Sequence, residues 1–274
     1  MATHVVHEWL RDAIASVFAS EGVRFNFVLV FDGVPLEEIQ EFINDERITC
    51  LVLEENLGHG GALHEGMKAV RTEYVARLDS DDLITKDRLA KQLDYLKSHQ
   101  EIVLVSCQMV TIDEDSNVTG KTQLPHGFDI RAELLETNVV CAGGSLSRRA
   151  VYEEAGGFDP SFRKYEDYEL WLRMAMLGPI SILDDHLYLY RVRSNSMSSK
   201  FRPWEGYLRV VLRRKRELAR LLKVDSRTLR KATSGWYYWQ WRAYFDKVRA
   251  RAAQNAPEWV RRLGRKLARS SQTS

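Results

Sequence analysis

Three carboxylates lie within four residues in the segment Leu78-Asp79-Ser80-Asp81-Asp82, which follows an apolar, strand-like stretch. Carboxylates this close repel one another and raise one another's pKa unless a cation lies among them. Asp79 and Asp81 can both reach one divalent ion, with waters or phosphate oxygens completing its octahedral shell. The cluster therefore indicates a site for a metal and a diphosphate. The alternative is a helix start with acidic neighbours, which the helix dipole favours.

Two better-known motifs are excluded by their spacing. An EF-hand starting at this cluster would need glycine and glutamate where the chain has Ile84 and Ala90. A dinucleotide-binding GxGxxG motif counted from Gly58 would need a third glycine where the chain has Leu63. The segment 56–61 therefore predicts only a glycine-rich turn near a phosphate or a ribose.

A second acidic pair, Glu166 and Asp167, begins the segment EDYELWLR, which has helical periodicity. Apolar residues at positions 170, 171, 174 and 177 give this helix one buried face. Because the helix dipole favours carboxylates at a helix start, a simple capping role is one interpretation. The other interpretation is a catalytic role for Asp167.

Over residues 1–110, the segments that must position these residues alternate between the periodicity of strands and that of helices. Strands are predicted, with helices between them, at residues 25–31, 48–53, 74–79 and 102–110. This alternation implies βαβ units and a doubly wound α/β domain with helices on both faces of a parallel sheet. Residues 1–6 are too short and polar a segment to predict a buried strand before the first helix.

The rest of the chain is less regular at first and then helical. A turn is predicted at residues 113–117, irregular structure to residue 160, a helix at 166–177 and strand-like pieces at 180–183 and 187–193. Beyond residue 199 the pattern is helical.

Composition narrows the class of protein. The 274 residues are 45% hydrophobic and 28% charged, the balance of a soluble globular protein. No run of about 18 uncharged apolar residues occurs, which argues against a membrane-spanning helix. The opening MATHVVHEWLRD is polar where a secretory signal needs an apolar core. A cytoplasmic protein is therefore expected.

The thiols and histidines do not form a recognisable metal site. Cys50, Cys107 and Cys141 are odd in number and far apart, so they predict reduced, buried thiols and no disulfide frame. His59 and His64 lack the spacing of a metal-binding pair and are interpreted as surface or capping residues.

Charge divides the chain into an acidic body and a basic tail. Residues 201–274 hold 20 Lys and Arg against five Asp and Glu, a net +15, and residues 1–200 carry −13. The tail also contains Trp204, Trp236, Trp239, Trp241 and Trp259. Basic residues mixed with aromatic ones suit an anionic surface, either a membrane or a nucleic acid. The alternative is a helical appendage whose aromatic residues pack on the body.

Three amphipathic helices are predicted in the tail, at about residues 208–222, at 237–248 and from Pro257 onward. In the last helix the apolar residues form one face and five basic residues form the opposite face, as in a helix that lies at a membrane interface. We therefore expect the extension 201–274 to hold the protein peripherally at the inner face of the cytoplasmic membrane.

In this order along the chain, the segments resemble the family 2 glycosyltransferases of the GT-A fold. The resemblance covers about residues 7–199 and rests on EWLRDAIASV, FDG, NLGHGGALHEG, YVARLDSDD, DRLAKQ, GGFD, EDYELWLR and YRVRSNSMS. It implies a GT-A domain at residues 1–200, with a doubly wound, Rossmann-like mixed sheet, and a helical C-terminal extension.

On the donor side, the resemblance assigns Asp79 and Asp81 to the DXD motif, which holds Mn²⁺ or Mg²⁺ against the diphosphate of a nucleotide sugar. It places Ser80 and Arg193 beside the same diphosphate. It also implies that Asp32 lies at the nucleotide-base pocket.

The resemblance further places the turn at Asn56 and Gly58 near the nucleotide. On the acceptor side, it assigns Asp167 as the base that removes a proton from the acceptor hydroxyl. Glu166 and Trp171 would then shape the acceptor pocket.

Four departures from the family pattern are visible. The usual opening strand is absent before His7, which suggests either a late start of the chain or an impaired enzyme. The paired aspartates of the second strand end are Phe31-Asp32, and a common arginine is Leu63. The usual closing histidine is Arg193, a cation able to meet a diphosphate.

These features together predict a metal-dependent, inverting hexosyltransferase. It would move a sugar from a nucleotide donor, a UDP-sugar by preference, to a glycan or lipid-linked acceptor in cell-surface polysaccharide synthesis. One alternative is a catalytically impaired GT-A-like module whose basic tail binds a membrane or a polyanion. Another is a nucleic-acid-binding protein, which would leave the three aspartates Asp79, Asp81 and Asp167 unexplained.

Overall fold

The computed structural model describes residues 1–162, 164–193 and 207–255. In chain order its elements are β1 (Ala2–Thr3), α1 (Trp9–Phe18), β2 (Phe27–Asp32), η1 (Leu36–Glu38), α2 (Gln40–Ile43), β3 (Ile48–Leu53), α3 (His59–Ala69), β4 (Tyr74–Ala76), β5 (Leu83–Ile84), α4 (Arg88–Ser98), β6 (Leu104–Ile112), β7 (Val118–Lys121), η2 (Glu133–Leu135), β8 (Leu146–Arg148), α5 (Arg149–Glu154), α6 (Glu166–Met174), β9 (Ile180–Arg191), α7 (Tyr207–Leu221) and α8 (Ser226–Asn255).

The strands form two sheets within the described residues. The first is parallel, in the order β1-β2-β3. The second has the order β4-β8-β6-β9-β5, with β7 added beside β6. In it β6 and β9 run parallel, whereas the other pairs are antiparallel. The α/β fold with a mixed strand arrangement is as predicted, but the strands are divided between two sheets.

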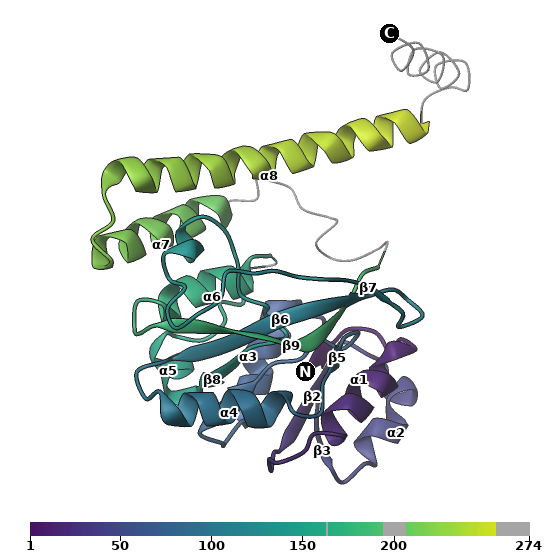
Figure 1. The fold of residues 1–274 in the computed structure, drawn as a ribbon. Helices are drawn as coiled ribbons and strands as arrows, with labels where there is room; N and C mark the ends of the chain where they lie inside the picture. Colours follow the sequence, from purple (N-terminus) through teal and green to yellow (C-terminus); the bar gives the residue numbers. More distant parts are fainter. Residues whose placement is uncertain (163, 194–206, 256–274) are drawn as a thin grey trace.

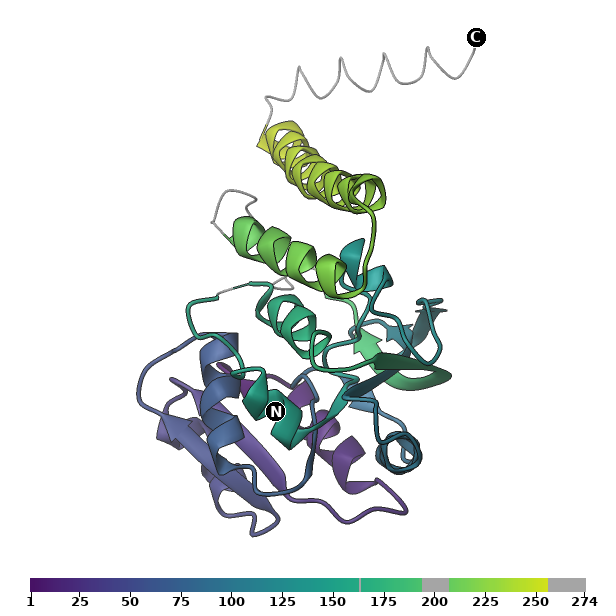
Figure 2. The ribbon, with the colours of Figure 1, turned by 90° about the vertical axis from the view of Figure 1, so that its left-hand side faces the viewer.

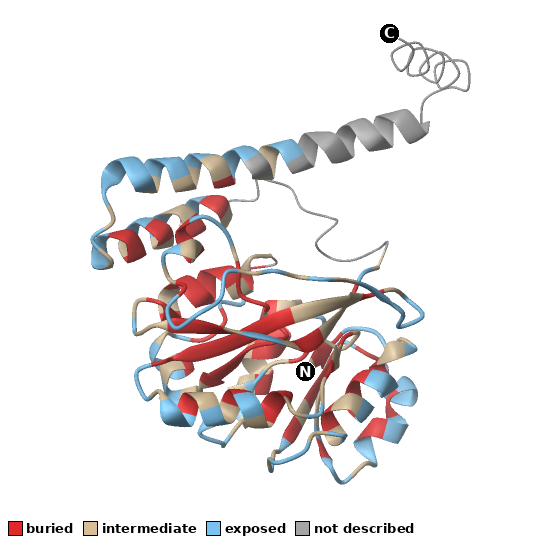
Figure 3. Ribbon diagram, viewed as in Figure 1, coloured by how far each residue is buried: buried red, intermediate tan, exposed pale blue. Residues whose placement is uncertain are grey.

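Helices cover the sheets, and the strands carry most of the buried surface (Figures 1 and 3). Phe27–Asp32 is an almost continuous apolar run because both faces of β2 are covered, as parallel strands require. In α1 the buried residues Leu10, Ala13, Ile14 and Val17 follow helical spacing and form one face toward the core. Cys107 and Cys141 are buried and free, and Cys50 is half-buried and free.

The prediction that the first six residues form no strand is wrong. Ala2 and Thr3 form β1 and pair in parallel with Val30 and Phe31 of β2. Both residues are buried, at 4% and 6% exposure. Local polarity is a poor guide here, because pairing with an already buried strand decides the conformation.

The two strand-like pieces predicted at 180–183 and 187–193 are parts of one long strand, β9. Its register against β6 shifts after Cys107, which pairs with Leu183, while Gln108 pairs with His186. The intervening Asp184 and Asp185 form this irregularity, and they interrupt the apolar pattern that a continuous strand would show.

The basic tail packs on the body through its first helix. Leu208, Val211 and Leu218 of α7 are buried in the same apolar cluster as residues of α6. Figure 2 shows α6, α7 and α8 as successive layers leading away from the sheets. Trp236 of α8 is also buried, at 4% exposure. The third predicted tail helix lies outside the described residues, and no helix among the described ones has the length and hydropathy that crossing a membrane requires.

An apolar cavity of about 250 Å³ separates the two sheets. It lies between β2 and β4 and is lined by Val28, Tyr74 and Met67 among others. β4 pairs with β8 along one edge, and Ala76 is exposed although it belongs to a strand. The α-amino group of Met1 donates to the Val28 carbonyl at 3.0 Å, and burial lowers its pKa to about 6. The cavity therefore lies between strand edges and has the buried Met1 amine in its lining.

We predict that five β-branched and apolar residues added before Met1 will raise Tm, because they would replace the buried amine by an amide and fill the cavity. A gain of about 1 kcal/mol corresponds to about 2–4 °C for a domain of this size. The control is an extension of five alternating glycines and serines, measured by calorimetry. Equal Tm values for the two extensions would contradict the prediction.

Candidate functional site

The acidic cluster lies directly after β4, where the chain leaves the sheet. Asp79 accepts a hydrogen bond from the Arg77 guanidinium at 3.0 Å, and the same guanidinium nitrogen lies 2.6 Å from His59 Nε2. Burial alone would raise the pKa of Asp79, but the charge and the hydrogen bond of Arg77 lower it below its usual value. Burial, with the Arg77 charge, lowers the pKa of His59 to about 4. Asp79 is therefore a carboxylate facing a neutral imidazole.

Asp81 meets a different cation. Its carboxylate forms an ion pair with Arg193, which follows the end of β9. The guanidinium carbon of Arg193 lies 5.5 Å from the centre of the Trp9 ring, a cation–π contact that holds the arginine in place. Burial raises the pKa of Asp81 although Arg193 opposes the shift. Between the two aspartates, the Ser80 hydroxyl lies 3.1 Å from Nε2 of His7.

The third carboxylate of the cluster has a structural role. Asp82 is 1% exposed and accepts from the Tyr188 hydroxyl at 2.7 Å and the Arg191 amide at 2.6 Å. It therefore fixes β9 against the turn that carries Asp79 and Asp81. A side chain at Gly143 would overlap the Tyr188 hydroxyl and approach Oδ2 of Asp79 to 3.1 Å, so glycine keeps this space open.

Asp32 builds a small pocket beside this cluster. The Asp32 carboxylate accepts hydrogen bonds from the Leu57 amide at 2.7 Å and the Gly58 amide at 3.0 Å. The Asn56 side chain donates to the backbone carbonyl of Asp32 at 3.3 Å. Gly33 has a φ of +70°, and any side chain there would lie 2.8 Å from the Asn56 nitrogen.

The resulting cavity of about 190 Å³ is lined by Ala2, Thr3, His4, Asp32, Asn56, Gly58, His59 and Ala62. It runs from the turn predicted to lie near the nucleotide to His59, which contacts Arg77 beside Asp79. The larger cavity between β2 and β4 is mainly apolar in its lining residues and ends at strand edges. The smaller one therefore fits a polar ligand better.

The second acidic pair lies at the start of α6, as predicted. Tyr165 precedes the pair with a φ of +60°, a backbone conformation that residues other than glycine rarely adopt. Asp167 accepts from the Asn138 side-chain amide at 3.0 Å and from the Tyr168 amide at 2.7 Å. Burial raises the pKa of Asp167, and it raises that of the neighbouring Glu166 to about 7. Both carboxylates are poised to take up a proton more readily than an exposed acid.

Arg77 connects the two acidic clusters. Burial would lower the pKa of its guanidinium, but the charges of Asp79, Asp167 and Glu166 raise it above its usual value. The starts of α3 and α6 are also close, since a side chain at Gly60 would lie 3.2 Å from Cβ of Glu166. The structure therefore gathers carboxylates from distant segments around one buried cation.

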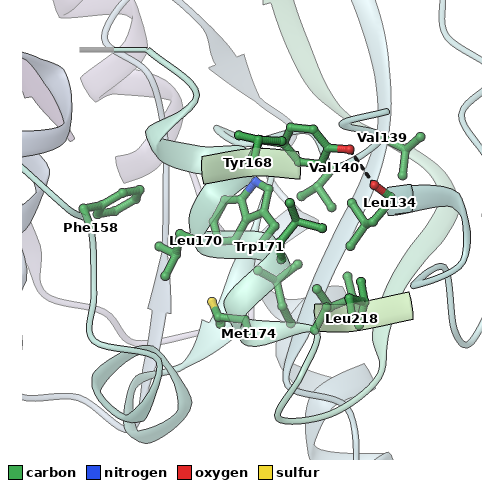
Figure 4. Close-up of a cluster of buried hydrophobic side chains, with 14 of the residues drawn as sticks. Leu134, Val139, Val140, Phe158, Tyr168, Leu170, Trp171, Met174 and Leu218 are labelled. Carbon is green, nitrogen blue, oxygen red and sulfur yellow. Dashed lines mark hydrogen bonds between the residues drawn. The ribbon is translucent and has the colours of Figure 1, made fainter. Parts of the chain in front are cut away.

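Trp171 lies one helical turn further along α6, on its buried face. It is 3% exposed and packs against Phe158, with ring centres 6.5 Å apart, inside the apolar cluster of Figure 4. Its indole nitrogen has no hydrogen-bond partner among the described residues. This is the environment of a core residue, and a role for Trp171 in an acceptor pocket stays a prediction.

Asp79 and Asp81 suit a divalent ion only when substrate phosphates complete its coordination. Among the described residues no group of three or more His, Cys, Asp and Glu is arranged to hold a metal. Mg²⁺ and similar ions commonly use one or two carboxylates plus substrate phosphates, and Asp79 and Asp81 supply those two. The fit requires that Arg193 share or release Asp81, to which it is paired.

Three residues of the site were not found from the sequence. Arg77 could have been found, because residues two apart on a strand share a face and Arg77 precedes Asp79 by two in the predicted strand 74–79. His59, interpreted as a surface or capping residue, begins α3 and is half-buried against Arg77. Asn138 belongs to the irregular segment before residue 160, where no periodicity indicates which side chains point inward.

Solved structures show the same fold. The S. aureus TarS fragment 1–349 in complex with UDP-GlcNAc has a TM-score of 0.64 to this chain at 19% identity, covering 81% of this chain and 70% of that one. The predicted GT-A fold class, with a helical C-terminal region, is thereby confirmed.

Sequence comparison then identifies the family. The model described as glycosyl transferase family 2 matches residues 1–156. The amylovoran biosynthesis glycosyltransferase AmsE of Erwinia amylovora is 32% identical over 182 residues, covering 65% of this chain and 68% of AmsE. WfaP of Escherichia coli, a UDP-Glc:α-D-GlcNAc-diphosphoundecaprenol β-1,3-glucosyltransferase, is 28% identical over 179 residues, covering 63% and 68%. The chain belongs to glycosyltransferase family 2 and is a glycosyltransferase.

The raised pKa of Glu166 predicts a pH-dependent gain of stability on its replacement. The folded pKa is about 7 against an ordinary 4.5, so the favourable contribution of the neutral carboxyl is full below pH 4.5 and lost as the pH rises to 7. Glu166→Gln stays neutral and should raise Tm at about pH 8 but not at about pH 4.5. Exposed Glu154→Gln is the control, and identical behaviour of both variants would contradict the assignment.

Proposed function

We propose that this glycosyltransferase is metal-dependent and inverting, and that it transfers a hexose from a UDP-sugar to a hydroxyl of a glycan or lipid-linked acceptor. The observation that carries the proposal is the convergence of Asp79, Glu166 and Asp167 on Arg77. The charges of both acidic segments act on one guanidinium, which supports a diphosphate-side carboxylate and a base-side carboxylate pair at one site, as single displacement at an anomeric carbon requires.

On the acceptor side, Asp167 removes the proton of the attacking hydroxyl. A carboxylate with a raised pKa is a better base than an exposed one, and burial raises that of Asp167. The Asn138 amide orients the carboxylate, and Glu166 is the neighbouring acid at the start of α6. As the acceptor oxygen bonds to the anomeric carbon, the bond from that carbon to the diphosphate breaks, and one displacement inverts the configuration.

On the donor side, Asp32 and the turn at Asn56 and Gly58 hold the nucleotide in the cavity of about 190 Å³. Asp79 and Asp81 would hold Mn²⁺ or Mg²⁺ against the diphosphate, and such an ion would supply charge neutralisation for the leaving group. Arg193 supplies a further cation at the same place, and Ser80 a hydroxyl.

The names of relatives support the donor and acceptor classes. WfaP is named for a UDP-glucose donor and a diphosphoundecaprenol-linked acceptor, and the TarS fragment was solved with UDP-GlcNAc. AmsE is named for amylovoran biosynthesis. We extend these classes, a UDP-sugar and a glycan or lipid-linked acceptor, to this chain.

Calorimetric titration of UDP, with and without Mn²⁺, tests the donor site. We expect micromolar binding that depends on the metal and is weakened at least about tenfold in Asp81→Asn, because one ligand of the ion is lost. Asp115→Asn, in the exposed turn after β6, is the matched control. GDP and deoxythymidine diphosphate, titrated in parallel, identify the base.

Asp167→Asn separates binding from catalysis. We expect it to keep UDP affinity and to lose about 10²–10⁴-fold in the rate of sugar transfer or donor hydrolysis, because general-base catalysis is removed. Metal-independent UDP binding would contradict the metal site. Absence of any nucleotide binding would favour the impaired module with a polyanion-binding tail.

We further propose that the extension 201–274 binds an anionic membrane at the cytoplasmic face. Arg209, Arg213, Arg216 and Arg220 are exposed and share one face of α7, at intervals of four, three and four residues. The opposite face of α7 is buried against the body. Each basic residue near an anionic leaflet contributes about 1 kcal/mol, so four on one face make a useful docking surface.

Flotation with vesicles tests the membrane proposal. Binding to vesicles containing phosphatidylglycerol should fall when the four arginines are replaced by glutamine, and it should weaken with salt. A variant with four replacements at exposed acidic residues of the body, charge-matched in number, serves as the control. Binding that is indifferent to the arginines would refute the role of α7.

A further inference from the structure

A lysine of the tail is buried where α7 packs against the Tyr168 ring of α6. Lys215 of α7 has 0% exposure. Its amine donates to the Glu136 carbonyl at 3.3 Å and lies 4.0 Å from the ring centre of Trp236 and 5.4 Å from that of Tyr168. Burial lowers the pKa of the amine to about 7. A methionine would fill this apolar site without the cost of desolvating a charge, so packing alone does not account for a lysine here.

The groups that Lys215 contacts are close in the chain to those that hold Asp167. Tyr168 follows Asp167 directly, and its hydroxyl donates to the Leu134 carbonyl at 2.5 Å, as Figure 4 shows. Two residues beyond Glu136, the Asn138 amide donates to the Asp167 carboxylate at 3.0 Å. The short segment 134–138 is therefore tied at one point to α7 and at two points to α6.

Two further contacts join the tail to the same helix. Arg214, next to Lys215, donates to Glu169 at 2.9 Å, and the Glu169 side chain is 3% exposed. Tyr165, the residue with a positive φ before the acidic pair, donates to Gln240 of α8 at 2.5 Å. Its ring centre lies 6.0 Å from that of Trp236. An unfavourable backbone conformation persists only where its surroundings hold it, and here the tail does so.

We propose that Lys215 is a positioning residue for Asp167. By holding segment 134–138 against α6, it keeps the Asn138 amide on the Asp167 carboxylate. The inference rests on the proposed role of Asp167 as the base. It makes the tail part of the acceptor side of the site as well as an appendage of the domain.

The test uses the full chain with Lys215→Met, which keeps length and removes the amine, and Lys215→Arg, which keeps a cation. Lys231→Met, at an exposed position of α8, is the matched control. The readout is UDP release from UDP-glucose and UDP-GlcNAc. We expect kcat to fall about 10- to 100-fold in Lys215→Met, with the donor KM changed less than about twofold, and partial recovery in Lys215→Arg. Tm should be unchanged or higher, because an apolar side chain replaces a buried amine.

A titration without substrate gives a second, independent readout. In protein labelled with ¹³C at the aspartate carboxyls, the Asp167 signal is assigned by its loss in Asp167→Asn. Lys215→Met should raise the pKa of Asp167, because the Asn138 hydrogen bond that lowers it is loosened. In an Asn138→Ala background the same substitution should have no effect, whereas loss of a through-space charge would shift the pKa in both backgrounds.

These outcomes separate the inference from the proposed function. Failure of the wild-type chain to bind UDP or release it from donors would overturn the proposed function, and the carboxyl titration would still decide on Lys215. The positioning role is overturned if Lys215→Met has wild-type kcat and an unchanged Asp167 titration. It is also overturned if kcat falls only in proportion to a lowered Tm.

Discussion

A buried guanidinium beside three carboxylates is the constraint on which the site depends. Arg77 lies against Asp79 and His59, and the charges of Glu166 and Asp167 act on it from another part of the chain. Removing one partner of a buried ion pair leaves an uncompensated charge and costs about 3–5 kcal/mol. Asp79 is therefore held by Arg77 directly, and the acidic pair of α6 is coupled to the same guanidinium through its charge.

A second constraint is the placement of α6, which the tail helps to hold. A helix that begins at a residue with positive φ and carries two buried acids has little stability of its own at that end. Contacts from Lys215, Arg214 and Trp236 supply what the local sequence does not. The basic tail thus neutralises a buried acid of α6 and also packs an aromatic ring against the same helix.

Much of this could be predicted from the sequence, because it depends on local pattern. Strand periodicity located β2, β3 and β6, and the acidic segments at 79–82 and 166–167 stood at an element end and a helix start, as expected. The contacts of His59 and Asn138 could not be predicted, since they arise from segments far apart in the chain. Lys215 was concealed in the basic run 213–216, although its spacing with Val211 and Leu218 places it on the buried face.

The cavity between β2 and β4 has a consequence for how firmly the two sheets hold together. Side chains that face a void lose the dispersion contacts that a filled core provides. Val28, Met67 and Tyr74 line this cavity, so the two sheets adhere less tightly here than where their side chains interdigitate. Local opening of the domain should therefore begin along this boundary.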